Sequence, residues 1–534
     1  MDRRAFVSLL TPLALSTGDR AMARTSRSSA AEAQASFPWL DASIAQLQAA
    51  MQSRRTSAQA LVRAYLARIE ALDRHGPQLR SVIETDPQAL AHAAALDQER
   101  RATGPRSPLH GIPVLLKDNI ATADRMSTSA GSLALAGVTA VRDAHVVARL
   151  RAAGAVILGK TNLSEWANIR STRSTSGWSA RGGLTRNPYA LDRNTSGSSS
   201  GSAAAIAADL AAVAVGTETD GSIVSPSSIN GLVGLKPTVG LCSRDGIIPI
   251  SHTQDTPGPM TRSVADTAAL LSALAGPDPR DAATASAQPQ DYTRALDPRA
   301  LAGKRLGVVR NQFGGNDRVN AVIDAALGVL KAQGAVLVDP VELKNVEKYN
   351  DAPELDVLLF ELKAGLDKFL PDVLPGAPVK SLKDVIAWNE AHRAQEMPWF
   401  GQELFERAQA KGGLDDPAYR EALATCARYA RTEGIDALLA EHKLDGLVAP
   451  TGGPAWLTDF VNGDHYGGSF STPAAVAGYP HLTVPAGFVQ GLPVGLSFVG
   501  PAYSEALLIG MGFAFEQATK ARRAPSFAKT VKLD

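Results

Sequence analysis

The chain has 534 residues, which is enough to bury a large hydrophobic core. Its formal net charge is only +1 and its basic residues are scattered, so nothing points to nucleic acid or an anionic membrane as a partner. Two cysteines, Cys242 and Cys426, are too few for a disulfide framework or a zinc knuckle. We expect them to be unpaired core residues, with a single bridge as the alternative if the chain is exported.

The N-terminus has the three parts of an export signal. The pair Arg3-Arg4 precedes a short apolar stretch at 5–15, and Ala21-Met22-Ala23 supplies small residues where a signal peptidase could cut. The arginine pair indicates the twin-arginine route, and the apolar stretch is too short for a permanent membrane anchor. We therefore predict a signal peptide over residues 1–23, a flexible lead-in over 24–36, and a periplasmic protein without stable membrane anchoring.

Apolar strands alternate with helices along the rest of the chain. Helical spacing begins near Asp41 and continues after Ser57, a candidate N-cap. The alternation favours an α/β fold, a mixed twisted β-sheet with helices on both faces, in one large domain over 37–530. A helical insertion is expected at about 340–445. Buried strands are predicted at 112–117, 155–160, 212–216, 445–450, 481–485 and 494–499.

Two segments rich in small polar residues should carry the chemistry. Residues 171–202 are crowded with Ser, Gly, Thr, Asn and Arg, which predicts a long loop, followed by a helix at 203–212. The loop contains Gly197-Ser198-Ser199-Ser200-Gly201-Ser202. The second segment, Gly216-Thr217-Glu218-Thr219-Asp220-Gly221-Ser222, turns away from a predicted strand. An earlier strand ends in Leu115-Leu116-Lys117-Asp118-Asn119.

These three blocks, in this order and spacing, resemble the amidase signature family, and the resemblance extends from about residue 40 to the C-terminal region. It implies a hydrolase that cuts C–N amide bonds through an acyl-enzyme. Carried over to the matching positions, it implies that Ser222 is the nucleophile, Ser198 a bridging serine with an unusual cis peptide bond, and Lys117 the base. It also implies an oxyanion hole made by the backbone N–H groups of Thr219, Asp220, Gly221 and Ser222.

The residue chemistry agrees with a lysine base. A serine hydroxyl attacks only when a base removes its proton, and the histidines of this chain avoid the Ser/Gly blocks. Lys117 ends an apolar run, and burial would lower its pKa toward neutrality. Lys236 is a rival base, but its place in a Gly-Leu-Lys-Pro turn favours a structural role. Taken alone, Lys117 would be a surface lysine at a strand end, and the serines would be helix caps.

The chain departs from the family pattern at three glycine positions. Ser196 and Ser200 replace glycines around Ser198, and Asp220 replaces the first glycine of a Gly-Gly-Ser turn. The backbone N–H of Asp220 survives this substitution. Its carboxylate, if it enters the pocket, would repel an anionic substrate group and attract an amine or carboxamide.

Within the family, the stretches 164–168, 176–183, 197–202, 216–222 and 240–250 are similar to bacterial peptide amidases. This resemblance implies removal of the C-terminal amide of a peptide with release of ammonia. The alternatives are a broad amidase or aryl acylamidase, a glutaminase subunit of a tRNA-dependent amidotransferase, and a binding module without activity. We expect a monomer that needs no metal or cofactor. Four residues could line the substrate groove: Trp166, Asn168, Trp178 and Ser199. Aromatic residues, however, more often pack in a core.

Overall fold

The computed structural model describes residues 37–350 and 352–531. The predicted signal peptide, 1–23, and lead-in, 24–36, lie outside the described residues. Within the described part of the chain, none of the helices has the combination of length and apolar character that crossing a bilayer requires.

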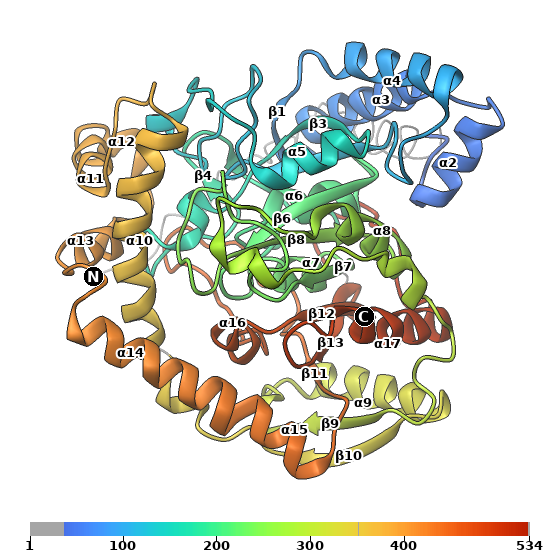
Figure 1. The fold of residues 1–534 in the computed structure, drawn as a ribbon, viewed down its shortest axis with the longest axis vertical. Helices are drawn as coiled ribbons and strands as arrows, with labels where there is room; N and C mark the ends of the chain where they lie inside the picture. The colour runs from blue at the N-terminus through green and yellow to red at the C-terminus, as the bar shows by residue number, and fades with distance from the viewer. Residues whose placement is uncertain (1–36, 351, 532–534) are drawn as a thin grey trace, which may run out of the picture.

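An 11-stranded mixed sheet runs through the molecule (Figure 1), and it joins strands from both halves of the chain in the order β1-β3-β2-β6-β8-β7-β12-β13-β11-β9-β10. Its strands are β1 Val82–Thr85, β2 Pro113–Lys117, β3 Val156–Thr161, β6 Val213–Glu218, β7 Val233–Lys236, β8 Thr256–Thr261, β9 Arg305–Val309, β10 Val336–Val341, β11 Gly446–Pro450, β12 His481–Val489 and β13 Leu492–Val499. A separate pair consists of β4 Trp178–Ser179 and β5 Gly183–Leu184.

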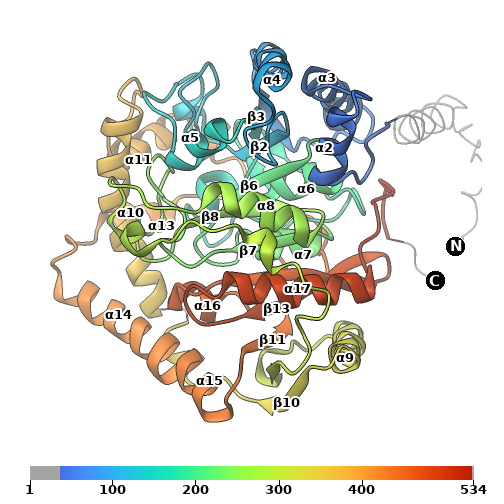
Figure 2. The ribbon, with the colours of Figure 1, turned by 45° about the vertical axis from the view of Figure 1, so that its right-hand side comes forward.

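Helices cover both faces of this sheet, as predicted (Figure 2). Strand β12 shows the division, because Leu482 and Val484 lie against α17 while Thr483, between them, lies on the side of α7. The helices are α2 Ile44–Gln52, α3 Ala58–Arg68, α4 Ala89–Thr103, α5 His145–Ala152, α6 Ser200–Ala207, α7 Val224–Ile229, α8 Val264–Leu274, α9 Asp317–Ala332, α10 Ala352–Val373, α11 Leu382–Ala391, α12 Arg393–Glu396, α13 Glu403–Gln409, α14 Pro417–Ala427, α15 Asp436–His442, α16 Thr472–Ala477 and α17 Glu505–Thr519.

The stretch 340–445, expected to be mostly helical, holds α10 to α15. These helices lie along one side of the molecule in Figure 1. Ser57 caps α3 as predicted, its hydroxyl accepting a hydrogen bond from the N–H of Ala60. Cys242 and Cys426 are both free and buried, which confirms the expectation of two unpaired core cysteines.

The sequence prediction was wrong about several element boundaries. Helix α6 begins at Ser200, inside the predicted loop, and ends at Ala207, because the chain turns at Asp209 with a positive φ of 56°. The segment ending in Lys236 is strand β7, although its Gly-Leu-Lys-Pro sequence suggested a turn. Its neighbour β8 was not predicted, because its sequence contains two prolines and a glycine.

Candidate active site

The three catalytic candidates come from a strand end and two neighbouring segments at one edge of the sheet. Strands β2 and β6 are parallel neighbours, with Leu116 paired with Val215. Because the carboxyl ends of parallel strands meet at the same edge, Lys117 at the end of β2 lies beside Thr217 near the end of β6. Ser198 precedes α6, and Ser222 lies in the turn between β6 and α7.

Lys117 is fully buried and its ammonium nitrogen has three oxygen neighbours. Nζ lies 2.7 Å from Ser198 Oγ, 2.9 Å from Thr217 Oγ1 and 3.1 Å from the Thr217 carbonyl oxygen. A neutral amine has two N–H groups and one lone pair. If the two N–H groups bond Thr217, the lone pair is left for the Ser198 hydroxyl, which is the arrangement that a base requires.

The surroundings of Lys117 favour its neutral form. Burial lowers the pKa of Lys117 to about 7, although the nearby carboxylates of Asp255 and Glu218 act in the opposite direction. An amine with this pKa is substantially deprotonated at neutral pH and can accept a proton. The geometry and the pKa together therefore fit the predicted role of Lys117.

The segment carrying Ser198 is fixed on both sides. The N–H of Ser164, just beyond β3, donates to the Ser198 carbonyl at 3.1 Å. The peptide bond between Gly197 and Ser198 is cis, the geometry that the resemblance implies. Ser199 is buried, and its hydroxyl donates to the Thr217 carbonyl at 3.1 Å while accepting from the Thr217 N–H at 3.2 Å. These bonds hold the Ser198 hydroxyl against Lys117.

The Glu218 side chain stabilises the turn around Ser222 through hydrogen bonds to the backbone. One carboxylate oxygen of Glu218 accepts from the N–H groups of Ile223 and Val224, at 2.7 and 2.9 Å. The Ser222 carbonyl accepts from the N–H of Ser199 at 3.1 Å, which joins the two serine segments. Ser222 itself is 8% exposed. Among the hydrogen bonds between described residues, none joins the hydroxyls of Ser198 and Ser222.

The predicted oxyanion donors lie in this turn. No hydrogen bond between described residues uses the backbone N–H of Thr219, Asp220, Gly221 or Ser222 as its donor. The four groups are therefore free of protein acceptors, as groups that bind a developing negative charge must be. Gly221 has a φ of 74°, a conformation that favours glycine.

The side chain of Asp220 is held by the N-terminal end of α16. Its carboxylate accepts from the Thr472 hydroxyl at 2.6 Å. Burial raises the pKa of Asp220, while hydrogen bonds from Ser471 and Thr472 and the charge of Lys236 act in the opposite direction. The idea that this carboxylate contacts an amine or carboxamide of the substrate stays a prediction.

The predicted groove residues are largely buried. Trp166 packs edge-to-face against Phe405, and Trp178 packs edge-to-face against Phe400. The amide of Asn168 donates to the Ser176 hydroxyl at 3.1 Å. Both tryptophans are therefore held by packing against phenylalanines, and their contact with substrate stays a prediction.

A small cavity of about 10 Å³ is lined by one of the three catalytic candidates, Ser198. Ser198, Thr217 and Thr219 line it, and its volume corresponds to about one water molecule. Arg244, Ile247 and Asp255 line both this cavity and a neighbouring open groove of about 500 Å³. These three residues therefore form the wall between the two spaces.

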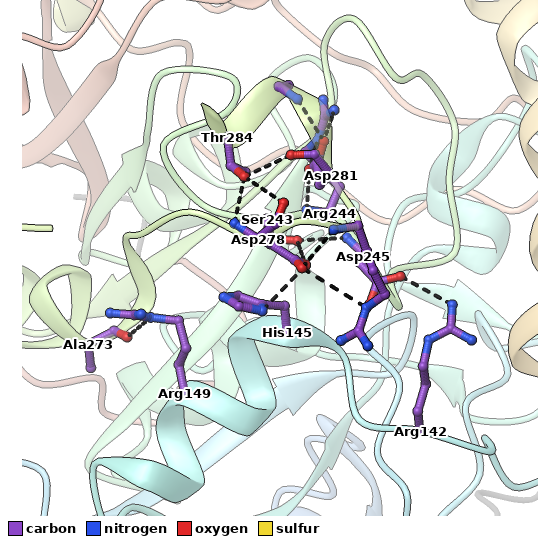
Figure 3. Close-up of polar contacts among 12 residues, drawn as sticks. Arg142, His145, Arg149, Ser243, Arg244, Asp245, Ala273, Asp278, Asp281 and Thr284 are labelled. Atoms are coloured by element: carbon purple, nitrogen blue, oxygen red, sulfur yellow. Dashed lines mark hydrogen bonds and ion pairs between the residues drawn. The ribbon is translucent and has the colours of Figure 1, made fainter. Parts of the chain in front are cut away.

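A network of hydrogen bonds and ion pairs surrounds Arg244, whose guanidinium belongs to that wall (Figure 3). Arg244 donates two hydrogen bonds to Asp281, at 2.6 and 2.7 Å. Nearby, Ser243 donates to buried Asp278 at 2.7 Å, and Asp245 accepts from Arg142 at 3.1 Å. The bidentate pair with Asp281 sets the orientation of the Arg244 guanidinium in this wall.

Sequence reasoning missed Thr217 and Asp255. Thr217 lies in the same sequence block as Ser222, and this position could have indicated that Thr217 belongs to the site. Asp255 accepts from the Thr219 hydroxyl at 2.5 Å and from the N–H groups of Ile250 and Ser251, at 2.8 and 2.9 Å. No pattern near Asp255 in the sequence indicates these contacts. The rival base Lys236 donates to the Pro237 carbonyl at 3.1 Å, and the acidic groups near it are Glu218, Glu505 and Asp220.

Replacing Thr217 by valine is expected to lower kcat by about 10- to 100-fold, because Lys117 and Asn119 both donate to its hydroxyl and would lose a buried acceptor. Thr217→Ser keeps the hydroxyl and should retain most of the activity. Steady-state kinetics and thermal unfolding of both variants check this. Equal kcat for wild type and Thr217→Val would show that the hydroxyl does not orient Lys117.

Among the described residues, no three His, Cys, Asp or Glu side chains gather where a metal ion could be held.

The sequence profile of the Amidase family matches residues 60–509. A probable amidase of Arabidopsis thaliana is 43% identical over 502 residues, 92% of either chain. A glutamyl-tRNA(Gln) amidotransferase subunit of Cupriavidus metallidurans is 37% identical, covering 89% of this chain and 97% of that protein.

The fold is also similar to solved structures of the same family. The native peptide amidase of Stenotrophomonas maltophilia superposes with a TM-score of 0.87 at 55% identity, covering 92% of this chain and 99% of that enzyme. The family match covers most of the chain, and the similarity extends over the whole mixed sheet. The chain therefore belongs to the amidase signature family and is an amidase, a hydrolase of carbon–nitrogen bonds.

Proposed function

We propose that this amidase removes the C-terminal amide of peptides, with Ser222 as nucleophile, Ser198 as proton bridge and Lys117 as base. Neutral Lys117 takes the proton of Ser198 as Ser198 takes the proton of Ser222. The Ser222 oxygen then bonds to the amide carbon, and the backbone N–H groups of residues 219–222 hold the oxyanion. The proton returns through Ser198 to the nitrogen, the C–N bond breaks, and ammonia leaves. Water hydrolyses the ester on Ser222 by the same route.

The observation that carries the substrate assignment is the size of the cavity beside Ser198. In this mechanism Ser198 delivers the proton to the departing nitrogen, so that nitrogen must lie next to the Ser198 hydroxyl. The cavity there is about 10 Å³, room for a group the size of water or ammonia. We therefore expect the departing nitrogen to be unsubstituted, because an aryl ring is much larger than this space. The 55% identity to a peptide amidase supports the same assignment.

A peptide amide should be a better substrate than an anilide with the same acyl group. We expect kcat/KM for the primary amide to exceed that for the anilide by about 100-fold or more, because the aryl ring has no space beside Ser198. The two substrates share one acyl part, so the comparison isolates the leaving group. Ammonia and aniline release measure the two rates.

The same measurement separates the alternatives. Faster cleavage of the anilide would make the protein an aryl acylamidase and would remove the peptide assignment while leaving the triad in place. Free glutamine belongs in the same panel, because one relative is part of an amidotransferase. Ammonia release from free glutamine, without release from any peptide amide, would instead favour a glutaminase.

A further inference from the structure

Exposed apolar side chains recur in the segment 457–466, and one of them, Tyr466, lies next to the Ser222 turn. The described residues expose nine large hydrophobic side chains, and four of them are Trp399, Leu457, Val461 and Tyr466. We call these four, together with half-buried Phe460, the aromatic rim. A group of exposed apolar side chains on a protein surface often marks a binding site.

Tyr466 connects the aromatic rim to the nucleophile turn. A Cβ placed on Gly221, the residue before Ser222, would lie 3.8 Å from the Tyr466 hydroxyl. Tyr466 also lines a small cavity together with Ser225, Ser228 and Ile229 of α7, the helix that follows Ser222. Yet the residue as a whole is 47% exposed. The hydroxyl therefore lies against the catalytic turn while part of the ring faces solvent.

The segment that carries Tyr466 is anchored to the Ser198 loop. The N–H of Asn194 donates to the Trp456 carbonyl at 2.8 Å, and Asp464 accepts from the N–H of Ser176 at 3.0 Å. The indole N–H of Trp456 donates to Asp464 at 3.1 Å, and its ring packs edge-to-face on Tyr466. These contacts give Tyr466 a fixed position relative to both serines.

The outer part of the rim is contributed by the helical region. Trp399 is 50% exposed and stacks on Phe460, with ring centroids 4.5 Å apart. The next residue, Phe400, is buried against Trp178, and the guanidinium of Arg170 lies over its ring. Trp399 is therefore held in place by its buried neighbour while its own ring stays available.

We propose that the aromatic rim binds the side chain of the residue that carries the amide, so that the enzyme prefers peptide amides ending in a hydrophobic or aromatic residue. This inference rests on the proposed peptide amidase function. In that function the small cavity beside Ser198 takes the leaving nitrogen, so the acyl part must extend away from this cavity. Tyr466 borders that turn, and its exposed ring offers apolar surface to a side chain leaving the carbonyl.

The test compares N-acetyl-alanyl dipeptide amides that end in phenylalanine, leucine or glycine. For the wild type, kcat/KM for the phenylalanine amide should exceed that for the glycine amide by about tenfold or more. Tyr466→Ala should remove most of this preference, whereas Tyr466→Phe keeps the ring and should retain it. Trp399→Ala should reduce the preference by a smaller factor. Tyr503→Ala, at a tyrosine that is 45% exposed outside the rim, is the matched control and should leave the preference unchanged.

The outcomes distinguish this inference from the function on which it rests. Equal rates for the phenylalanine and glycine amides in the wild type overturn the inference while the peptide amidase function stands. An equal loss on all three amides in Tyr466→Ala also overturns it, because Tyr466 would then only support the fold. No ammonia from any peptide amide overturns the proposed function and the inference together.

Discussion

Replacing Ser222 by alanine is expected to lower ammonia release from a peptide amide by about 10⁴-fold or more. The variant loses the atom that forms the acyl-enzyme, and neither Ser198 nor Lys117 can replace it. The substitution removes one oxygen from a residue that is 8% exposed and whose backbone makes the bond to Ser199. The fold should therefore be retained.

An ammonia assay with an N-acylated dipeptide amide measures this effect. Circular dichroism and thermal unfolding show whether the variant is folded. The matched control is Ser225→Ala, which removes a nearby hydroxyl that pairs with Ser196 at 2.8 Å. Comparable ammonia release by wild type and Ser222→Ala would show that Ser222 is not the nucleophile.

Replacing Lys117 by methionine is expected to lower kcat by about 10³-fold, because methionine fills much of the same space without accepting a proton. The pH profile gives a second signature. The base is the deprotonated lysine, whose pKa burial lowers to about 7. For the wild type, kcat/KM should therefore be low at acid pH, rise through about pH 7 and level off above it.

The residual activity of Lys117→Met should lack this rise. Lys236→Met is the matched control, because burial also lowers the pKa of Lys236, to about 8, without a serine hydroxyl among its hydrogen-bond partners. That variant should keep the rise near pH 7. Loss of the rise in Lys236→Met, with its retention in Lys117→Met, would assign the base to Lys236.

The parts of the site that the sequence predicts are those carried by continuous segments. An apolar run ending in a lysine predicts β2 and its buried terminal Lys117, and the Ser/Gly-rich stretch predicts the loop that carries Ser198. The contact between Lys117 and Ser198 joins distant segments, and only the family resemblance implied it. The structure confirms that contact with a distance of 2.7 Å.

Other features follow from packing that the sequence does not show. Strand β8 lies between β6 and β7 although it contains Pro257 and Pro259. The two prolines are two residues apart, so their nitrogens face the same side of the strand. The missing N–H donors therefore affect the pairing with only one neighbouring strand. The sequence pattern therefore resembles a turn, and only the completed sheet makes it a strand.

Tyr466 and Asp255 illustrate the same limit at the site. Tyr466 belongs to a glycine-rich segment without helical or strand periodicity, yet the pairing of neighbouring Trp456 with Asn194 brings it to Gly221. Asp255 acts through hydrogen bonds to Thr219 and to its own loop. Neither position has a local pattern that distinguishes it from an ordinary surface residue.

The central claim is that a peptide acyl group becomes attached to Ser222, and rapid acid quenching followed by peptide mapping tests it most directly. Wild-type protein is mixed with excess N-acylated dipeptide amide, quenched during the first turnover, digested and analysed by mass spectrometry. We expect the mass of the acyl group on the peptide containing Ser222 and expect it to be missing in Ser222→Ala. An acyl group on another residue, or a burst of ammonia without acylated protein, would contradict it.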